Sequence, residues 1–136
     1  MQVLLPDISK FKIINGQQFQ NQKRICIFAF YSPIPGCFSS LERVLALHQT
    51  NNVYTLLISL DTEQKMKSYI NEDSPRGSIL KQINIAIDEN NTMASFMSYN
   101  KFDALPAVYL FDEQKVMQWR GNPNDSALKS RVEYGV

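Results

Sequence analysis

Three runs of apolar, β-forming residues recur along the chain, and each is followed by a stretch with helical spacing. They are ICIFAF (25–30), VYTLLISL (53–60) and INIAID (83–88). Continuous apolar runs of this length are typical of strands that are buried on both faces of a sheet. Strands that alternate with helices pair in parallel through right-handed crossovers. We therefore predict an α/β fold with a central sheet flanked by helices.

Between these runs, apolar residues return every three or four positions, which is the spacing of a helix with one buried face. Asp61 or Thr62 and Asn91 or Thr92 have the short polar side chains that begin helices. The predicted helices cover residues 38–48, 62–72, 90–102 and 124–136.

Turn-forming residues predict two hairpins and one loop. Asn15-Gly16 separates two candidate strands at 9–14 and 17–20, and it is a strong hairpin signal. A second hairpin joins AVYLFD and KVMQWRG around residues 112–114, which adds an antiparallel edge and makes the sheet mixed. The polar stretch EDSPRG (72–77) is predicted to be a loop.

Composition excludes several classes of protein. The 136 residues predict one domain over 1–136, and a net charge of +1 without a basic stripe argues against nucleic acid as a partner. The apolar runs are too short to span a bilayer, and no signal peptide is visible. Two cysteines and one histidine make a disulfide scaffold or a metal site improbable, so we expect no metal and no cofactor.

The segment FYSPIPGC (30–37) runs from a predicted strand through a tight turn to a cysteine at the start of a predicted helix. Aligned peptide dipoles at a helix start stabilise a thiolate, so Cys37 is a candidate reactive thiol, and a partly buried inert cysteine is the alternative. Position 34, three residues earlier, is isoleucine, which cannot attack a disulfide. Cys26 lies in a predicted central strand and should be buried, which leaves a Cys26–Cys37 disulfide as a minor alternative.

Pro106 stands directly before the apolar run AVYLF. Proline lacks the N–H that a strand residue donates to its neighbouring strand. Pro106 must therefore be the first residue of this strand or lie in a special turn before it.

Four stretches in this order resemble the TlpA-type branch (redoxin, AhpC/TSA-like) of the thioredoxin superfamily. They span residues 4–121. The resemblance implies a thioredoxin-like fold with a mixed sheet, an N-terminal β-hairpin and an extra strand–helix insertion. It also places Ile34 at the first and Cys37 at the second position of the Cys-x-x-Cys motif. The four stretches are LPDISKFKIINGQQF, IFAFYSPIPGCFSSLERV, LLISLDTEQKMKSYI and YNKFDALPAVYLFDEQKVMQWRG.

The same resemblance implies that Pro106 is a cis-proline facing the turn, where it helps to pair with an extended substrate peptide. It also implies an extracytoplasmic setting. The binding groove would then be formed by Tyr31, Ile34, Pro35, Leu105 and Pro106.

Two hypotheses of function follow. In the first, the chain lacks dithiol–disulfide turnover and binds an extended peptide or partner protein in this groove. In the second, it is a single-cysteine thiol oxidoreductase or a peroxiredoxin-like antioxidant protein that acts through Cys37. A peroxide site needs a threonine or serine where Ile34 stands, and Arg43 and Arg120 are candidates for its arginine by residue type alone.

Overall fold

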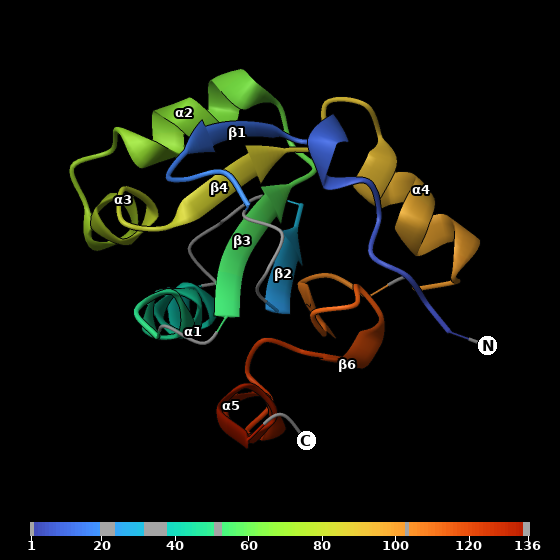
Figure 1. The fold of residues 1–136 in the computed structure, drawn as a ribbon. Coiled ribbons are helices and arrows are strands. Elements are labelled where there is room, and N and C mark those ends of the chain that lie inside the picture. Colours follow the sequence, from blue (N-terminus) through green and yellow to red (C-terminus); the bar gives the residue numbers. More distant parts are fainter. Residues whose placement is uncertain (1, 20–23, 32–37, 51–52, 103, 135–136) are drawn as a thin grey trace.

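The computed structural model describes residues 2–19, 24–31, 38–50, 53–102 and 104–134. In this part of the chain, six strands form one mixed sheet in the order β1-β4-β3-β2-β5-β6, flanked by helices (Figure 1). No helix among these residues is both long and apolar enough to cross a membrane. The strands are β1 (Lys12–Asn15), β2 (Arg24–Phe30), β3 (Val53–Ser59), β4 (Asn84–Ile87), β5 (Ala107–Phe111) and β6 (Met117–Gly121). The helices are the 3-10 helix η1 (Ile8–Lys10), α1 (Phe38–His48), α2 (Glu63–Ile70), α3 (Pro75–Leu80), α4 (Thr92–Tyr99) and α5 (Ala127–Tyr134).

The centre of the sheet is parallel and its outer pairs are antiparallel. β2 pairs in parallel with β3, and β3 with β4, as the alternation of strands and helices predicts. The predicted hairpin at residues 112–114 is confirmed, since β5 and β6 pair antiparallel and β5 also pairs antiparallel with β2. The predicted α/β class with a mixed sheet is therefore confirmed.

Two apolar layers cover the two faces of the sheet. On one face, Cys26, Phe28 and Phe30 of β2 pack with residues of α1, α2, α3 and α5. On the other face, Ile25 and Ile27 of β2 pack with Phe11 and with residues of α4. Residues 25–29 of β2 are 0% exposed, so this strand is buried on both sides as its unbroken apolar run predicts.

The predicted N-terminal hairpin is wrong. β1 pairs antiparallel with β4, and residues 17–19 form no strand. Asn84 accounts for the difference, because its side-chain Oδ1 accepts a hydrogen bond from the Gln17 N–H at 2.7 Å and so occupies a main-chain donor that a hairpin strand would use. Gly16 has φ +84° and lies so close to Asn84 that a Cβ atom would be 2.2 Å from that oxygen.

The predicted loop over 72–77 is also partly wrong, because α3 begins within it at Pro75. The side chain of Ser74 accepts a hydrogen bond from the Gly77 N–H at 3.0 Å, and Pro75 occupies the first turn, where its missing N–H does no harm. The polar composition of this stretch thus reflects a helix start and not a loop.

Segment 3–5 pairs with residues 115–117, at the start of β6. Leu4 forms an antiparallel bridge with Val116, the Met117 N–H donates to the Val3 carbonyl at 2.8 Å, and the Leu5 N–H donates to the Lys115 carbonyl at 2.9 Å. These bonds satisfy main-chain groups that an edge strand would otherwise leave unpaired.

The start of α4 depends on a residue other than those predicted. Asn91 stands at the cap position but makes no side-chain cap hydrogen bond. Instead the carboxylate of Asp88, which is 8% exposed, accepts from the N–H groups of Met93 and Ala94, each at 2.8 Å. For α2 the prediction is confirmed, since the Thr62 hydroxyl accepts from the Lys65 N–H at 3.3 Å.

We predict that Asp88→Ala lowers the free energy of unfolding by about 1–3 kcal/mol, because two N–H groups at the start of α4 lose a charged acceptor. Urea unfolding followed by circular dichroism measures the change. Asp7→Ala is the matched control, since Asp7 also accepts from a nearby N–H, that of Ser9, but is exposed. Equal losses for the two variants would contradict this account of α4.

Candidate functional site

The carboxyl end of β2 and the start of β5 meet at one end of the sheet. Ala29 is paired antiparallel with Ala107, so Tyr31, which follows β2, and Leu105, which precedes β5, lie at the same end of the sheet although they are far apart in the sequence. Tyr31 is 63% exposed and Leu105 is 41% exposed, whereas Phe30 and Ala107 are 1% and 5% exposed. An exposed apolar pair thus adjoins the buried core.

The main chain at this point changes direction. The peptide bond between Leu105 and Pro106 is cis, and β5 begins at the next residue, Ala107. Pro106 therefore precedes the strand, where its missing N–H costs the ladder no hydrogen bond. Neither main-chain polar group of Leu105 hydrogen-bonds to another residue in the described part of the chain.

A buried serine fixes the point at which the chain leaves β2. The hydroxyl of Ser59, which is 0% exposed, donates to the Tyr31 carbonyl at 3.1 Å and accepts from the Asp61 N–H at 3.1 Å. The Leu60 N–H donates to the Phe30 carbonyl at 2.9 Å, which extends the β2–β3 ladder. The ends of β2 and β3 are thereby held together. Ser59 is not among the predicted site residues, although a single hydroxyl at the end of the apolar run LLIS indicates a buried side chain that bonds main-chain groups.

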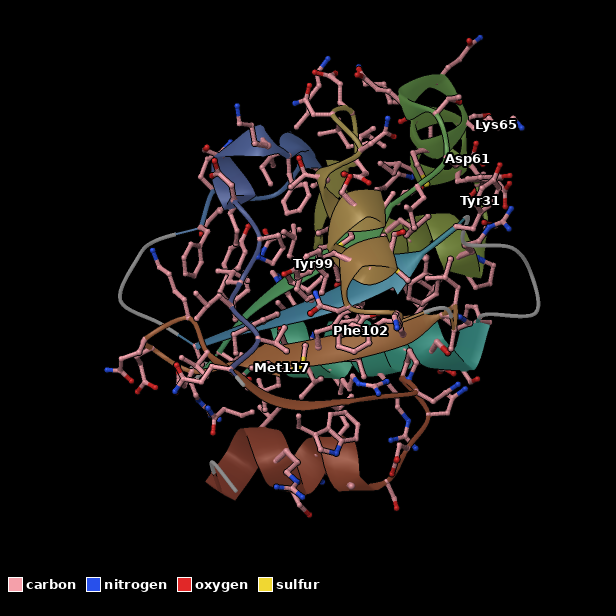
Figure 2. The ribbon with its side chains drawn as sticks, turned by 90° about the vertical axis from the view of Figure 1, so that its right-hand side faces the viewer. Tyr31, Asp61, Lys65, Tyr99, Phe102 and Met117 are labelled. Carbon is pink, nitrogen blue, oxygen red and sulfur yellow. The ribbon has the colours of Figure 1, made fainter. Side chains whose placement is uncertain are left out.

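Asp61 lies beside this network at the start of α2. Its side chain is 6% exposed, and its Oδ1 accepts from the Thr62 N–H at 2.8 Å and lies 3.9 Å from the Nζ of Lys65. Figure 2 shows Tyr31, Asp61 and Lys65 at the same end of the molecule. The Asp61 carboxylate and the Lys65 ammonium group thus lie at the end of the molecule where Tyr31 is exposed.

Of the predicted groove residues, Tyr31, Leu105 and Pro106 lie at the same end of the sheet, and a groove between them stays a prediction. Ile34, Pro35 and Cys37 lie outside the described residues, so their part in the groove stays a prediction.

Cys26 is free and completely buried in β2, as predicted, and burial raises the pKa of its thiol. A thiol in this state is a poor nucleophile, because only the thiolate attacks.

The two arginines that are candidates for a peroxide site make other contacts, and Glu42 and His48 lie on α1, exposed and half-buried respectively. Arg43 points toward the Asp125 carbonyl, 3.5 Å away, and Arg120 stacks on the ring of Phe102 at 4.2 Å. Among the residues that the structure describes, no group of three or more His, Cys, Asp and Glu side chains could hold a metal ion.

We predict that Ser59→Ala lowers the free energy of unfolding by about 1–3 kcal/mol, because the part-buried Tyr31 carbonyl and Asp61 N–H lose their partner. Urea unfolding measures this change, and hydrogen exchange of the Asp61 amide should become faster. Ser78→Ala, at an exposed helical position, should change stability by less than about 0.5 kcal/mol. Unchanged exchange at Asp61 would show that the Ser59 hydroxyl does not hold this end of the sheet.

Comparisons with known proteins identify the fold. No protein-family model and no curated protein matches the sequence. Solved structures do match. A thiol-disulfide isomerase from Corynebacterium glutamicum aligns at 15% identity over 96% of this chain and 92% of its own, with a TM-score of 0.70. A thiol-disulfide oxidoreductase from Bacteroides fragilis aligns at 17% identity over 89% and 86%, with a TM-score of 0.64. A 2-Cys peroxiredoxin from Plasmodium vivax aligns at 17% identity over 86% and 77%, with a TM-score of 0.61. The architecture described above is therefore a thioredoxin-like fold.

Proposed function

We propose that this chain is a thioredoxin-like domain that binds an extended peptide or partner segment beside the Leu105–Pro106 bond and does not carry out dithiol–disulfide turnover. The groove would use Tyr31, Leu105 and Pro106, together with Ile34 and Pro35 of the connecting segment.

The exposure of Tyr31 and Leu105 at the same end of the sheet is the observation that carries this proposal. Large apolar side chains exposed on one part of a surface favour a partner that covers them. The main-chain groups of Leu105 have no partner in the described part of the chain, so an extended peptide could pair with them as an added strand. Main-chain pairing would supply affinity, and the apolar side chains would select the residues of the peptide.

The cysteine content supports the absence of two-thiol turnover. Exchange requires an attacking thiolate and a second thiol that resolves the mixed disulfide. The chain has two cysteines, of which Cys26 is buried in β2 with a raised pKa. The residue three positions before Cys37 is Ile34, a hydrocarbon side chain that can neither attack nor resolve a disulfide.

A second candidate function is single-thiol chemistry at Cys37. This residue directly precedes α1 (Phe38–His48), and the positive end of a helix dipole stabilises a thiolate. Cys37 would then form a mixed disulfide with a client or be oxidised by peroxide, and an external thiol would have to reduce it again.

The peptide proposal predicts that loss of the apolar pair abolishes binding. A peptide selected from a random display library for binding to the wild-type chain is the probe, and its affinity is measured by isothermal titration calorimetry. Leu105→Asp and Tyr31→Ser should each weaken binding about tenfold or more, because a buried apolar contact is lost. Tyr99→Ser is the matched control, since Tyr99 is 85% exposed elsewhere, on α4, and its loss should leave affinity unchanged. Binding that survives both groove variants would rule out this groove.

If Ile34 and Cys37 hold the two positions of a Cys-x-x-Cys motif, the variant Ile34→Cys should form an internal disulfide and reduce insulin measurably. Its two thiols would then be three residues apart in the sequence, directly before α1. Mass spectrometry detects the disulfide, and insulin turbidity reports activity. Ile34→Ser is the control and should gain neither. If the Ile34→Cys variant forms no disulfide, the predicted register of the turn is wrong.

Thiol labelling of the wild-type chain distinguishes the two candidate functions. If Cys37 reacts with a thiol reagent only after denaturation, the result supports the peptide-binding domain. A fast-reacting native thiol with a pKa well below about 8.5, absent from Cys37→Ser, supports single-thiol chemistry.

A further inference from the structure

A pocket of about 220 Å³ lies next to Pro106, between β5, β6 and the segment that follows α4. It lies on the α4 face of the sheet, because Ala107 and Tyr109 of its lining belong to the apolar layer that packs with α4. Its lining includes Phe102, Pro106, Ala107, Tyr109 and Arg120.

The end of α4 positions the aromatic wall of this pocket. Lys101 takes a left-handed conformation with φ 60°, and the Phe102 N–H donates to the Met97 carbonyl at 2.8 Å while the Lys101 N–H donates to the Ser98 carbonyl at 3.2 Å. This pattern is a Schellman motif, which turns the chain back against the helix. Figure 2 shows Phe102 beside the last turn of α4. Its ring stacks on Tyr109, with centroids 5.6 Å apart and planes at 22°.

Arg120 brings a positive charge to the pocket. It lies in β6 directly opposite Tyr109, and its guanidinium carbon is 4.2 Å from the centroid of the Phe102 ring. Stacking on a ring uses the face of the guanidinium and leaves the N–H groups at its edge available. In the described part of the chain, Arg120 makes no ion pair and no hydrogen bond. Arg120 is exposed to solvent, and its N–H donors, which are held by no described residue, remain available to an acceptor that enters the pocket.

Tyr109 adds a second unused donor. The residue is 1% exposed and lines the pocket, and its hydroxyl makes no hydrogen bond to any described residue. The hydroxyl oxygen is not among the fully buried polar atoms that lack a hydrogen-bond partner, so it is accessible and can donate to a group that enters the pocket. Burial raises the pKa of Tyr109 and Arg120 opposes this effect, so the hydroxyl stays protonated and can donate at neutral pH.

We infer that this pocket binds a carboxylate group, which accepts hydrogen bonds from the Arg120 guanidinium and the Tyr109 hydroxyl. The planar guanidinium fits the two oxygens of a carboxylate. Phe102, Pro106 and Ala107 form an apolar wall for the carbon atoms that carry the acid. The volume is smaller than the roughly 300–1,000 Å³ of pockets that hold whole small molecules, so the group is about the size of an acidic side chain.

This inference stands on the geometry of the pocket and does not require the proposed peptide groove. The carboxylate could belong to a free small acid or to an acidic side chain of a bound peptide, since Pro106 borders both the pocket and the groove.

The test is a titration of the ¹⁵N-labelled chain with blocked glutamate (N-acetyl-glutamate N-methylamide), followed by NMR. We expect saturable shifts at the amides of Ala107, Tyr109 and Arg120, and blocked glutamine should bind at least about tenfold more weakly because it lacks the charge. Arg120→Gln should weaken glutamate binding about tenfold or more, and Tyr109→Phe, which keeps the packing, should weaken it several-fold. Arg120→Lys should restore only part of the affinity because the fork of donors is lost.

Lys81→Gln is the matched control, since it removes the same charge from an exposed position after α3 and should leave binding unchanged. Equal binding of glutamate and glutamine, or an Arg120→Gln variant that binds as the wild type does, would overturn the inference. Stronger shifts at the same amides with inorganic phosphate would overturn the choice of carboxylate.

An extended pentapeptide with a central glutamate separates the two sources. A pentapeptide that binds about tenfold more tightly than blocked glutamate, with the gain lost in Leu105→Asp, assigns the carboxylate to a peptide. If the pentapeptide and blocked glutamate bind with equal affinity and Leu105→Asp changes neither, the carboxylate belongs to a free acid. That result would contradict the proposed peptide groove and still support the carboxylate pocket.

Discussion

The burial of β2 on both faces is the constraint on which the rest of this structure depends. Residues 25–29 are inaccessible to solvent, with α1, α2, α3 and α5 on one side and α4 on the other. A strand in this position must satisfy its main-chain groups through neighbours, and β3 and β5 provide them, one in parallel and one in antiparallel pairing. The position of β5 relative to β2 then decides which residues stand at the candidate site.

The site is a consequence of where this strand leaves the core. Ser59 donates to the Tyr31 carbonyl, and the pairing of Ala29 with Ala107 places Leu105 and Pro106 at the same end of the sheet. The pocket next to Pro106 has a different origin, because it needs the turn that ends α4 and the placement of Arg120 opposite Tyr109. Two separate structural elements, the end of β2 and the end of α4, thus converge on one proline.

Much of the fold could be predicted because burial leaves a regular pattern in the sequence. The predicted helix over 38–48 coincides with α1, and the apolar runs locate β2, β3 and β4. The hairpin after Gly16 could not be excluded from local signals, because it is prevented by Asn84, a side chain from β4. The roles of Ser59 and Tyr109 depend on strand register in the same way, and no local pattern encodes register between distant strands.

The N-terminal segment has a consequence for how other chains can approach. Because residues 3–5 pair with residues 115–117, the start of β6 is not open to pairing with a second molecule. The opposite border is the four-residue β1, whose ladder is interrupted between Ile13 and Asn15 and whose Lys12 side chain forms ion pairs with Glu63 and Glu89. Short, irregular and charged borders discourage open-ended assembly of sheets. An incoming strand therefore finds little to pair with at β1 and at the start of β6, whereas the amide and carbonyl of Leu105 bond to no described residue and remain available for main-chain pairing.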